Sequence, residues 1–269
     1  MMSKFLLSII SVCYNNPNEL LRTLRSFDGL NHEIFEVIIV DGSSNESCKK
    51  IAKSFPEFKY LGGPDTGKYH AMNKGLAASS GEAVLFMNSG DLLHDRVVIE
   101  AAIRQHSNRL TSALLYGDSI RVVGGKRIYV DAVDPSPETQ RLAVFPSHQS
   151  ILVPRLYHLE HLFDESMFFA ADSKMLRVAF DQLPSERLNF AVGEFSYGGA
   201  CTSPGSWALL RRQYSELLEV ASYTRWEKAK VAFSLVSRKL THMIFGEEAL
   251  QQAQARGLER KLAGSGAKS

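Results

Sequence analysis

Hydrophobic residues in the first 95 positions fall into short runs, and segments with helical spacing separate these runs. The runs are rich in β-branched residues, which predicts four buried strands at Phe5–Cys13, Phe35–Val40, Lys59–Leu61 and Ala83–Met87. Between them, apolar residues three and four positions apart predict helices at Asn18–Phe27, from Asn45 or Ser47 to Phe55, and at Tyr69–Ala78. Strands that alternate with helices through short connections predict an α/β fold with a mostly parallel central sheet flanked by helices.

The pattern is less regular after position 95. We expect helices at Val97–His106 and Ser173–Phe180, and strands at Ala113–Tyr116 (ended by Gly117-Asp118), Ile151–Val153 and Phe190–Val192. A hairpin is predicted for Ile120–Val123 and Arg127–Val130, turning on Gly124-Gly125. The polar segment Asp131–Thr139 is expected to be a loop over the site, and Gly198-Gly199 a mobile loop.

Polar residues follow each strand of the first half where the strand ends, at Tyr14-Asn15, Asp41, Asp65 and Asp91. Because ligands of open α/β sheets bind at the carboxyl ends of the strands, we expect these loops to converge on one ligand. Asp91 follows a buried strand and a Gly-containing turn, and its carboxylate suits a hard divalent cation that binds together with a diphosphate. The alternative for Asp41, Asp65 and Asp91 is ordinary turn or helix-capping chemistry, which favours the same residue types.

Composition narrows the classes of protein. A net charge of +2 over 269 residues is too small to indicate a nucleic-acid partner. The cysteines Cys13, Cys48 and Cys201 are scattered and form no CxxC pair, which argues against a disulfide framework or a structural zinc site. Neither a signal peptide nor an apolar run of about 20 residues is recognisable, which predicts a cytoplasmic protein.

The segment 206–245 differs from the rest of the chain. It has helical spacing and several aromatic residues, and its charges are seven Arg or Lys against three Glu. A basic amphipathic helix of this kind can lie on an anionic membrane surface, here the inner face of the cytoplasmic membrane. The alternative is a helical pair packed on the rest of the protein or on a second copy, as a homo-oligomer. From Glu247 onward we expect a fraying helix, with Gly264–Ser269 disordered.

Four segments, SIISVCYNN, the strand ending in VDGSS, PDTGKYHAMNKGLAASSG and LFMNSGD, together resemble the first half of a family 2 glycosyltransferase with the GT-A fold. The likeness is to the enzymes that build bacterial cell-surface polysaccharides such as lipopolysaccharide. It covers Leu6 to Asp91 and continues more weakly to Phe195. It implies a catalytic domain at 1–205, with a nucleotide-binding half at 1–95 and an acceptor half at 96–205, followed by a helical extension and tail at 206–269.

The resemblance implies roles for residues around a nucleotide-sugar donor. Val12 and Tyr14 would line the nucleobase pocket. Asp41 would accept a hydrogen bond from an N–H of a uracil-like base. Asp65 and Lys68 would lie beside the nucleoside or the diphosphate.

The resemblance also assigns the turn after the fourth strand. Asp91 would bind the Mn²⁺ or Mg²⁺ that bridges the diphosphate, and Asn88 and Ser89 would contact the donor. Many relatives carry an acidic residue where Asn88 stands, and often a second where Gly90 stands. A single carboxylate therefore remains here, which leaves open whether the metal is required.

On the acceptor side, Asp172 matches the catalytic base of related enzymes, which opens a helix at this point. Such a carboxylate takes the proton of a sugar hydroxyl as the hydroxyl attacks. The apolar run before Asp172 is expected to desolvate it and raise its basicity, and helix N-capping is its alternative role. His148 resembles a position where relatives often carry His facing the diphosphate or the acceptor, and a structural hydrogen-bonding role is its alternative.

We therefore expect an inverting, metal-assisted glycosyltransferase that moves a sugar from a nucleotide diphosphate, most simply a UDP-sugar, to a hydroxyl of a glycan or lipid-linked acceptor. A nucleotide-sugar pyrophosphorylase would need a Gly-rich, basic loop after the first strand, where this chain has Tyr14-Asn15-Asn16-Pro17. A NAD-dependent dehydrogenase is disfavoured because no G-x-G-x-x-G follows that strand. A non-catalytic nucleotide-sugar-binding relative stays open because of Asn88 and Gly90.

Overall fold

The computed structural model describes residues 5–196 and 205–265. Within these residues, one continuous sheet has the order β3-β2-β1-β4-β8-β6-β9-β5, and β7 pairs with β6 at its side. Its strands are β1 (Leu7–Cys13), β2 (Phe35–Asp41), β3 (Lys59–Gly62), β4 (Ala83–Phe86), β5 (Leu92–Leu93), β6 (Leu114–Val123), β7 (Lys126–Val130), β8 (Ile151–Pro154) and β9 (Ser185–Ser196). Strands β1–β4, β6 and β9 run in one direction, and β5, β7 and β8 run against them, so the mostly parallel sheet is confirmed.

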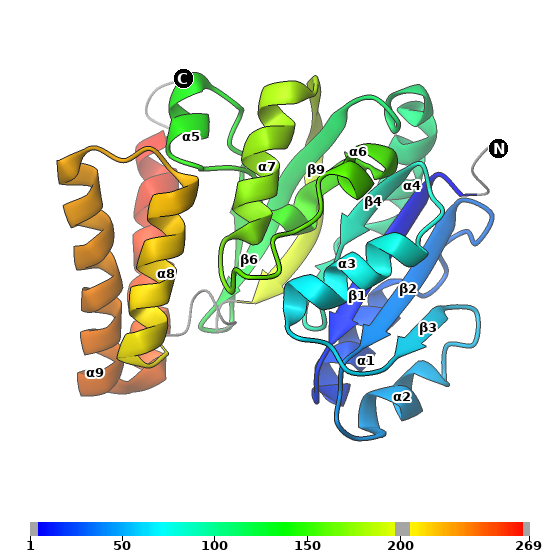
Figure 1. The fold of residues 1–269 in the computed structure, drawn as a ribbon, viewed down its shortest axis with the longest axis horizontal. Coiled ribbons are helices and arrows are strands. Elements are labelled where there is room, and N and C mark those ends of the chain that lie inside the picture. The colour runs from blue at the N-terminus through cyan, green and yellow to red at the C-terminus, as the bar shows by residue number, and fades with distance from the viewer. Residues whose placement is uncertain (1–4, 197–204, 266–269) are drawn as a thin grey trace.

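Helices cover both faces of the first half of the sheet (Figure 1). Helices α1 (Pro17–Ser26) and α2 (Ser47–Ala52) pack on one face, where Leu20 and Leu24 join the apolar cluster around Ile9 and Ile39. Helix α3 (Lys68–Ala78) packs on the other face. A Cβ on Gly75 of α3 would lie 2.4 Å from the Ile10 side chain, so only glycine allows this close approach of helix and sheet.

The acceptor half departs from prediction at Gly117-Asp118. These residues do not end a strand, because β6 continues through them to Val123. A Cβ on Gly117 would lie 2.7 Å from the Phe190 carbonyl oxygen of β9, and Asp118 is buried in an ion pair with Arg187 (3.0 Å). Gly117 therefore allows β6 and β9 to approach closely, and Asp118 places a buried carboxylate against Arg187. Both residues lie where the register between β6 and β9 shifts.

Further helices complete this half, namely α4 (Arg96–Gln105), α5 (Pro137–Arg141), α6 (Arg155–Glu160) and α7 (Ala171–Gln182). Helix α5 begins inside the segment predicted as a loop over the site and extends beyond it, and its N-terminus is capped by Ser136. Asp134 of this segment binds Tyr116 and Arg187 near the amino ends of β6 and β9, at the opposite edge from the first-half strand exits, so the expectation that the segment covers the site is wrong. Helix α4 is capped by Asp95, whose side chain accepts hydrogen bonds from Val97 and Val98, so Asp91 is not a helix cap. The predicted Gly198-Gly199 loop lies outside the described residues.

The C-terminal part is helical, as predicted, and packs beside the acceptor half (Figure 1). Helix α8 (Trp207–Val220) contacts α7, and α9 (Arg225–Ser265) is broken at Gly246, which has φ +80°. After the break, Ala255 packs on Val123, Ile128 and Val130 of the β6–β7 hairpin. The helix runs to Ser265, so Gly264 and Ser265 are helical where disorder was expected. Residues 266–269 lie outside the described residues. Among the described residues, none of the helices combines the length and the apolar character that crossing a bilayer requires.

Candidate active site

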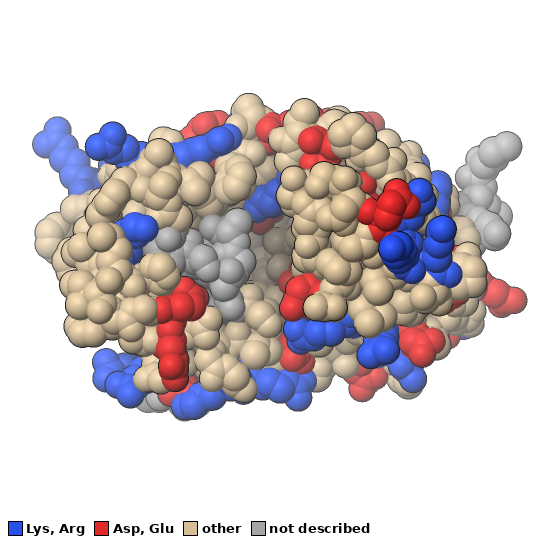
Figure 2. Space-filling model, turned by 90° about the horizontal axis from the view of Figure 1, so that it is seen from below, with Lys and Arg blue, Asp and Glu red and all other residues tan. Residues whose placement is uncertain are grey.

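A cleft of about 600 Å³ opens at the carboxyl ends of the first strands. Figure 2 looks onto this edge of the molecule and shows a hollow between the two halves. Six residues expected at the donor site line the cleft: Val12, Tyr14, Asp65, Lys68, Asn88 and Ser89. The cleft has the volume of a typical small-ligand site.

The strand exits meet at this edge. The Asn15 backbone N–H, after β1, donates to Ser43 Oγ after β2 at 2.8 Å, and the Ser89 N–H donates to the Val12 carbonyl at 2.9 Å. A Cβ on Gly42 would lie 1.8 Å from Asp65 Oδ2, so the Asp65 carboxylate lies directly over the Gly42 backbone. The exits of four strands therefore meet at this edge, as the topology predicts, and those of β1, β3 and β4 line the cleft.

Asp41 lies deeper than its expected role requires. It is buried, and its two carboxylate oxygens accept hydrogen bonds from the Tyr60 hydroxyl (2.8 Å) and the Ser43 N–H (2.9 Å). Cys13 and Cys48 lie beside it, with ligand atoms of all three within 4.8 Å of one another. Burial, and then the Asp41 charge, raises the pKa of the Cys13 thiol, which favours its protonated form. Contact of Asp41 with a base stays a prediction.

The turn after β4 holds a buried carboxylate. Asp91 accepts the Asn88 backbone N–H at 2.9 Å, and the Gly90 N–H donates to Thr23 Oγ1 of α1 at 2.9 Å, which fixes the turn. Burial raises the pKa of Asp91 to about 6, although the charge of His148 and a hydrogen bond from Gln149 act in the opposite direction. A carboxylate desolvated in this way gains from a nearby cation.

The residues of this turn fit a divalent cation. Among the buried side-chain atoms of the described residues, Asn88 Oδ1 and Ser89 Oγ have no hydrogen-bond partner. With the carboxylate of Asp91 they offer oxygen ligands, which Mg²⁺ and Mn²⁺ prefer. Buried polar atoms without partners are costly, so a ligand that satisfies them is favoured.

Asp172 and His148 form a pair on the acceptor side. His148 Nδ1 lies 3.1 Å from Asp172 Oδ2, and the Tyr69 hydroxyl donates to Asp172 Oδ1 at 3.1 Å. Burial raises the pKa of Asp172, but the hydrogen bond and charge of His148, together with the charge of Lys68 and the Ser173 N–H, outweigh it and lower the pKa to about 2. The expectation that desolvation makes Asp172 more basic is therefore wrong, because the sequence did not show its partner.

The same pair connects the two halves of the site. His148 Nε2 lies 3.5 Å from the Asn88 side-chain amide nitrogen, so His148 spans the distance between the β4 turn and Asp172. Asp172 lies in the first turn of α7, whereas the N-cap position is Ala170, so the N-capping alternative is wrong.

Three residues around this centre were not anticipated: Tyr69, Gln149 and Phe168. Tyr69 binds Asp172, Gln149 binds Asp91, and Phe168 lines the cleft. Tyr69 directly follows Lys68, and Gln149 directly follows His148. Their position next to expected site residues was therefore the sequence signal that could have identified them. Phe168 had no such signal.

Comparison with known families gives a match to Glycosyl transferase family 2 over residues 8–148, more than half of the chain. The chain belongs to this family. An uncharacterized glycosyltransferase of Mycobacterium tuberculosis is 30% identical over 125 residues, which are 45% of this chain and 48% of that protein. The poly(ribitol-phosphate) β-N-acetylglucosaminyltransferase TarP of Staphylococcus aureus is 34% identical over 100 residues, 34% of this chain and 30% of TarP. The aligned part thus spans about half or less of these relatives.

Solved structures show the same fold as this family 2 glycosyltransferase. Residues 1–349 of S. aureus TarS in complex with UDP-GlcNAc give a TM-score of 0.59 at 17% identity, covering 90% of this chain and 73% of that one. The mannosyltransferase PcManGT of Pyrobaculum calidifontis, in complex with GDP-Man and Mn²⁺, gives 0.55 at 15% identity, covering 100% and 76%. The GT-A-like architecture expected from the sequence is confirmed.

Proposed function

We propose that this protein is an inverting glycosyltransferase that moves a sugar from a UDP-sugar to a hydroxyl of a glycan or lipid-linked glycan, in the synthesis of a cell-surface polysaccharide. The observation that carries the proposal is the arrangement around Asn88. Its side-chain oxygen has no hydrogen-bond partner and lies in the turn that holds Asp91. Its amide nitrogen lies 3.5 Å from His148, which pairs with Asp172. The complex of TarS with UDP-GlcNAc and the name of TarP support a UDP-sugar donor.

The donor would lie along the first-half edge of the cleft. Val12 and Tyr14 would contact the base, and Asp65, which lines the cleft, is more accessible to the nucleoside than buried Asp41. Lys68 begins α3, and its ammonium and the backbone N–H groups of this helix start favour the negative diphosphate.

Asp91, Asn88 and Ser89 would hold the divalent cation. When bound there, Mn²⁺ or Mg²⁺ neutralises the charge that develops on the leaving diphosphate. The Mn²⁺ in the PcManGT complex supports the use of a metal.

Asp172 would be the base. Its carboxylate takes the proton of the acceptor hydroxyl while that oxygen bonds to the anomeric carbon and the bond to the diphosphate breaks on the opposite face, which inverts the anomeric centre. The low pKa keeps Asp172 ionised at neutral pH, and His148 Nδ1 and the Tyr69 hydroxyl hold its two oxygens in place.

Helix α9 suggests where the enzyme acts. Apolar side chains on its outer face repeat every three or four residues, and Phe233 is 74% and Trp226 69% exposed; the row is Trp226, Ala229, Phe233, Val236, Leu240 and Met243. Exposed Arg225, Lys228 and Lys230 lie beside this row. Because exposed basic side chains flank this apolar row, we propose contact with an anionic membrane surface, where lipid-linked acceptors are found.

The membrane contact is tested by co-sedimentation with vesicles of phosphatidylcholine, with and without phosphatidylglycerol. We expect binding only to the anionic vesicles, and its loss in Phe233→Ser. Leu156→Ser, which changes a 68% exposed residue of α6, is the matched control. A dimer in sedimentation without lipid, or equal binding to both vesicles, would refute the contact.

The transferase itself is tested by a thermal-shift screen with UDP-, GDP-, TDP- and CMP-sugars, with and without Mn²⁺, followed by donor hydrolysis. Ligand binding to the native state raises the melting temperature by mass action. We expect a shift with UDP-sugars and metal-dependent hydrolysis that Asp91→Ala abolishes. Binding without hydrolysis would favour the non-catalytic alternative, and family membership disfavours the pyrophosphorylase.

A further inference from the structure

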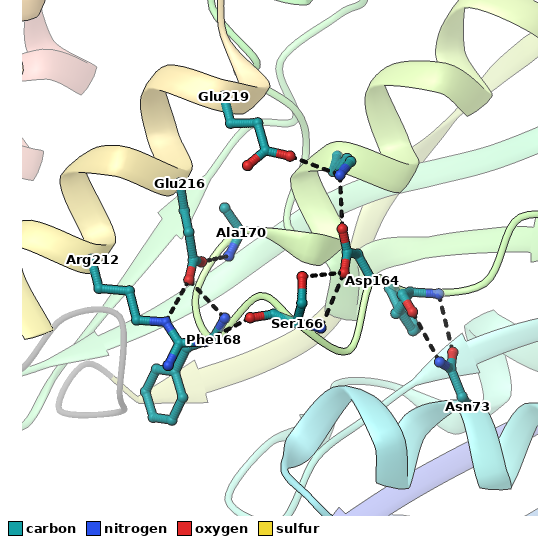
Figure 3. Close-up of polar contacts among 10 residues, drawn as sticks. Asn73, Asp164, Ser166, Phe168, Ala170, Arg212, Glu216 and Glu219 are labelled. Carbon is teal, nitrogen blue, oxygen red and sulfur yellow. Dashed lines mark hydrogen bonds and ion pairs between the residues drawn. The ribbon is translucent and has the colours of Figure 1, made fainter.

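A buried carboxylate of the C-terminal extension binds the loop that precedes Asp172 (Figure 3). Glu216 of α8 accepts the backbone N–H groups of Phe168 (2.8 Å), Phe169 (2.7 Å) and Ala170 (3.1 Å). It is only 6% exposed, which is unusual for a glutamate unless its oxygens are satisfied. Burial raises the pKa of Glu216, but these N–H groups and Arg212 outweigh it and lower the pKa, so the carboxylate is ionised at neutral pH.

Glu216 also caps the helix that carries Asp172. Ala170 is the N-cap of α7 and has no side chain that could accept a hydrogen bond, so the free N–H groups at this helix start need another acceptor. Glu216, which lies 46 positions further along the chain, accepts one of these groups, the N–H of Ala170. A negative charge at a helix N-terminus is also favoured by the helix dipole.

The bound loop belongs to the active site. Phe168 lines the donor cleft, and the Phe169 carbonyl accepts the Tyr69 hydroxyl at 2.8 Å. The same hydroxyl reaches Asp172 Oδ1 at 3.1 Å. The three N–H groups that Glu216 binds therefore lie between a cleft residue and the proposed base.

Neighbouring contacts hold the rest of the loop. Arg212 donates to Glu216 Oε1 (3.0 Å) and to the Ser166 carbonyl (2.7 Å), and its guanidinium lies 5.4 Å from the Phe168 ring centroid. At the other end, the Asn73 side chain of α3 donates to the Phe163 carbonyl and accepts the Phe163 N–H (Figure 3). It also donates to Glu165 at 2.9 Å. The loop is therefore fixed by the first half of the molecule at one end and by the C-terminal extension at the other.

We propose that Glu216 is a positioning residue of the transferase: by binding the 168–170 backbone and capping α7, it sets the position of Asp172 against the acceptor and of Phe168 in the cleft. This inference rests on the proposed function, because it assigns Glu216 to the same site. It makes α8 part of the catalytic apparatus.

The test compares Glu216→Gln with Glu100→Gln. Each Glu216 oxygen accepts two donors, so the amide NH₂ of Gln faces two N–H groups in either orientation. Glu100 also pairs with an arginine at i,i+4, Arg104, but on the surface of α4, away from the site. Because small displacements of reacting groups are costly, we expect Glu216→Gln to lower kcat at least tenfold, with a smaller change in donor KM, and Glu100→Gln to stay within twofold.

The double variant with Asp172→Asn separates positioning from a general structural defect. If Glu216 acts through Asp172, Glu216→Gln lowers the residual activity of Asp172→Asn less than twofold. The same tenfold loss in both backgrounds, or wild-type kcat in Glu216→Gln, would overturn the proposal and leave the proposed function intact. Wild-type kcat in Asp172→Asn would instead refute the proposed base, and with it the route by which Glu216 acts.

Arg212→Gln provides a second measurement in case Glu216→Gln fails to fold. Arg212 is 46% exposed, so its replacement is tolerated more easily, and it removes the contact to Ser166. We expect faster amide hydrogen exchange at 168–170 together with a several-fold loss of kcat. Unchanged exchange and unchanged kcat would count against the proposal.

Discussion

Replacing Asp91 with asparagine should make the protein more stable at neutral pH while it removes metal-dependent donor binding. Asp91 is buried and accepts the Asn88 backbone N–H, which the carbonyl oxygen of asparagine can also accept. The substitution therefore keeps the shape and the turn hydrogen bond, and it removes the buried charge together with one acceptor oxygen, which the hydrogen bond from Gln149 uses. A site residue that costs stability is expected where binding requires a desolvated carboxylate.

The magnitude follows from the pKa. The folded pKa of about 6 lies above the ordinary value of 3.8, so the folded state binds the proton more tightly than the unfolded state. The stability that this tighter proton binding gives the folded state is fully present below pH 3.8 and is lost as the pH rises through about 6. At 1.36 kcal/mol per pKa unit, the wild type is destabilised at pH 8 by about 3 kcal/mol relative to a neutral side chain.

Urea denaturation of both proteins at a series of pH values between 4 and 8 measures this effect. We expect similar free energies of unfolding near pH 4 and a more stable Asp91→Asn near pH 8. With UDP-sugar and Mn²⁺ added, only the wild type should gain stability. An Asp91→Asn protein that is less stable at pH 8, or a difference that does not change with pH, would show that burial does not control this carboxylate.

Three further outcomes are expected. His148→Gln removes the strongest contact that lowers the pKa of Asp172, so that pKa should rise and move the acid limb of the pH–kcat/KM profile upward; an unmoved limb would contradict the pairing. Phe27→Ala, in the core beneath α1, should lower the free energy of unfolding by about 3–5 kcal/mol in urea, with Leu156→Ala within about 0.5 kcal/mol. Gly75→Ala should lower the free energy of unfolding by about 1–3 kcal/mol in the same assay, because the added methyl group would push α3 away from β1. A neutral effect would show that α3 and β1 can move apart without cost.

The first half of the fold could be predicted because its signals are local. Each strand there is an apolar run that a turn ends, and each helix follows within a few residues, so periodicity and short connections fix the topology. The polar residues at the strand ends then follow from the parallel arrangement, and six of the expected donor residues line one cleft. Asp41 shows the limit of this reasoning, since a residue at the right edge can still point into the core.

The acceptor half depends on contacts that the sequence pattern does not report. Asp172 meets Tyr69 across 103 positions and Glu216 binds Ala170 across 46, and neither partner has a periodic signal. Gly117-Asp118 reads as a turn because a buried aspartate paired with Arg187 has the same residue types as a loop. The pKa of Asp172 was misjudged for the same reason, because the direction of its shift depends on His148 and Lys68, which are distant in the sequence.

The continuous ladder through the molecule has a consequence for engineering. Strand β8 pairs with β4 on one side and with β6 on the other, so the two halves share one backbone hydrogen-bond network. A chimera that joins the first 95 residues to the remainder of a relative would have to rebuild this seam with foreign side chains. Exchange of individual loops at the rim, such as the 163–170 loop before α7 that carries Phe168, leaves the ladder intact and is the more practical route to a new acceptor.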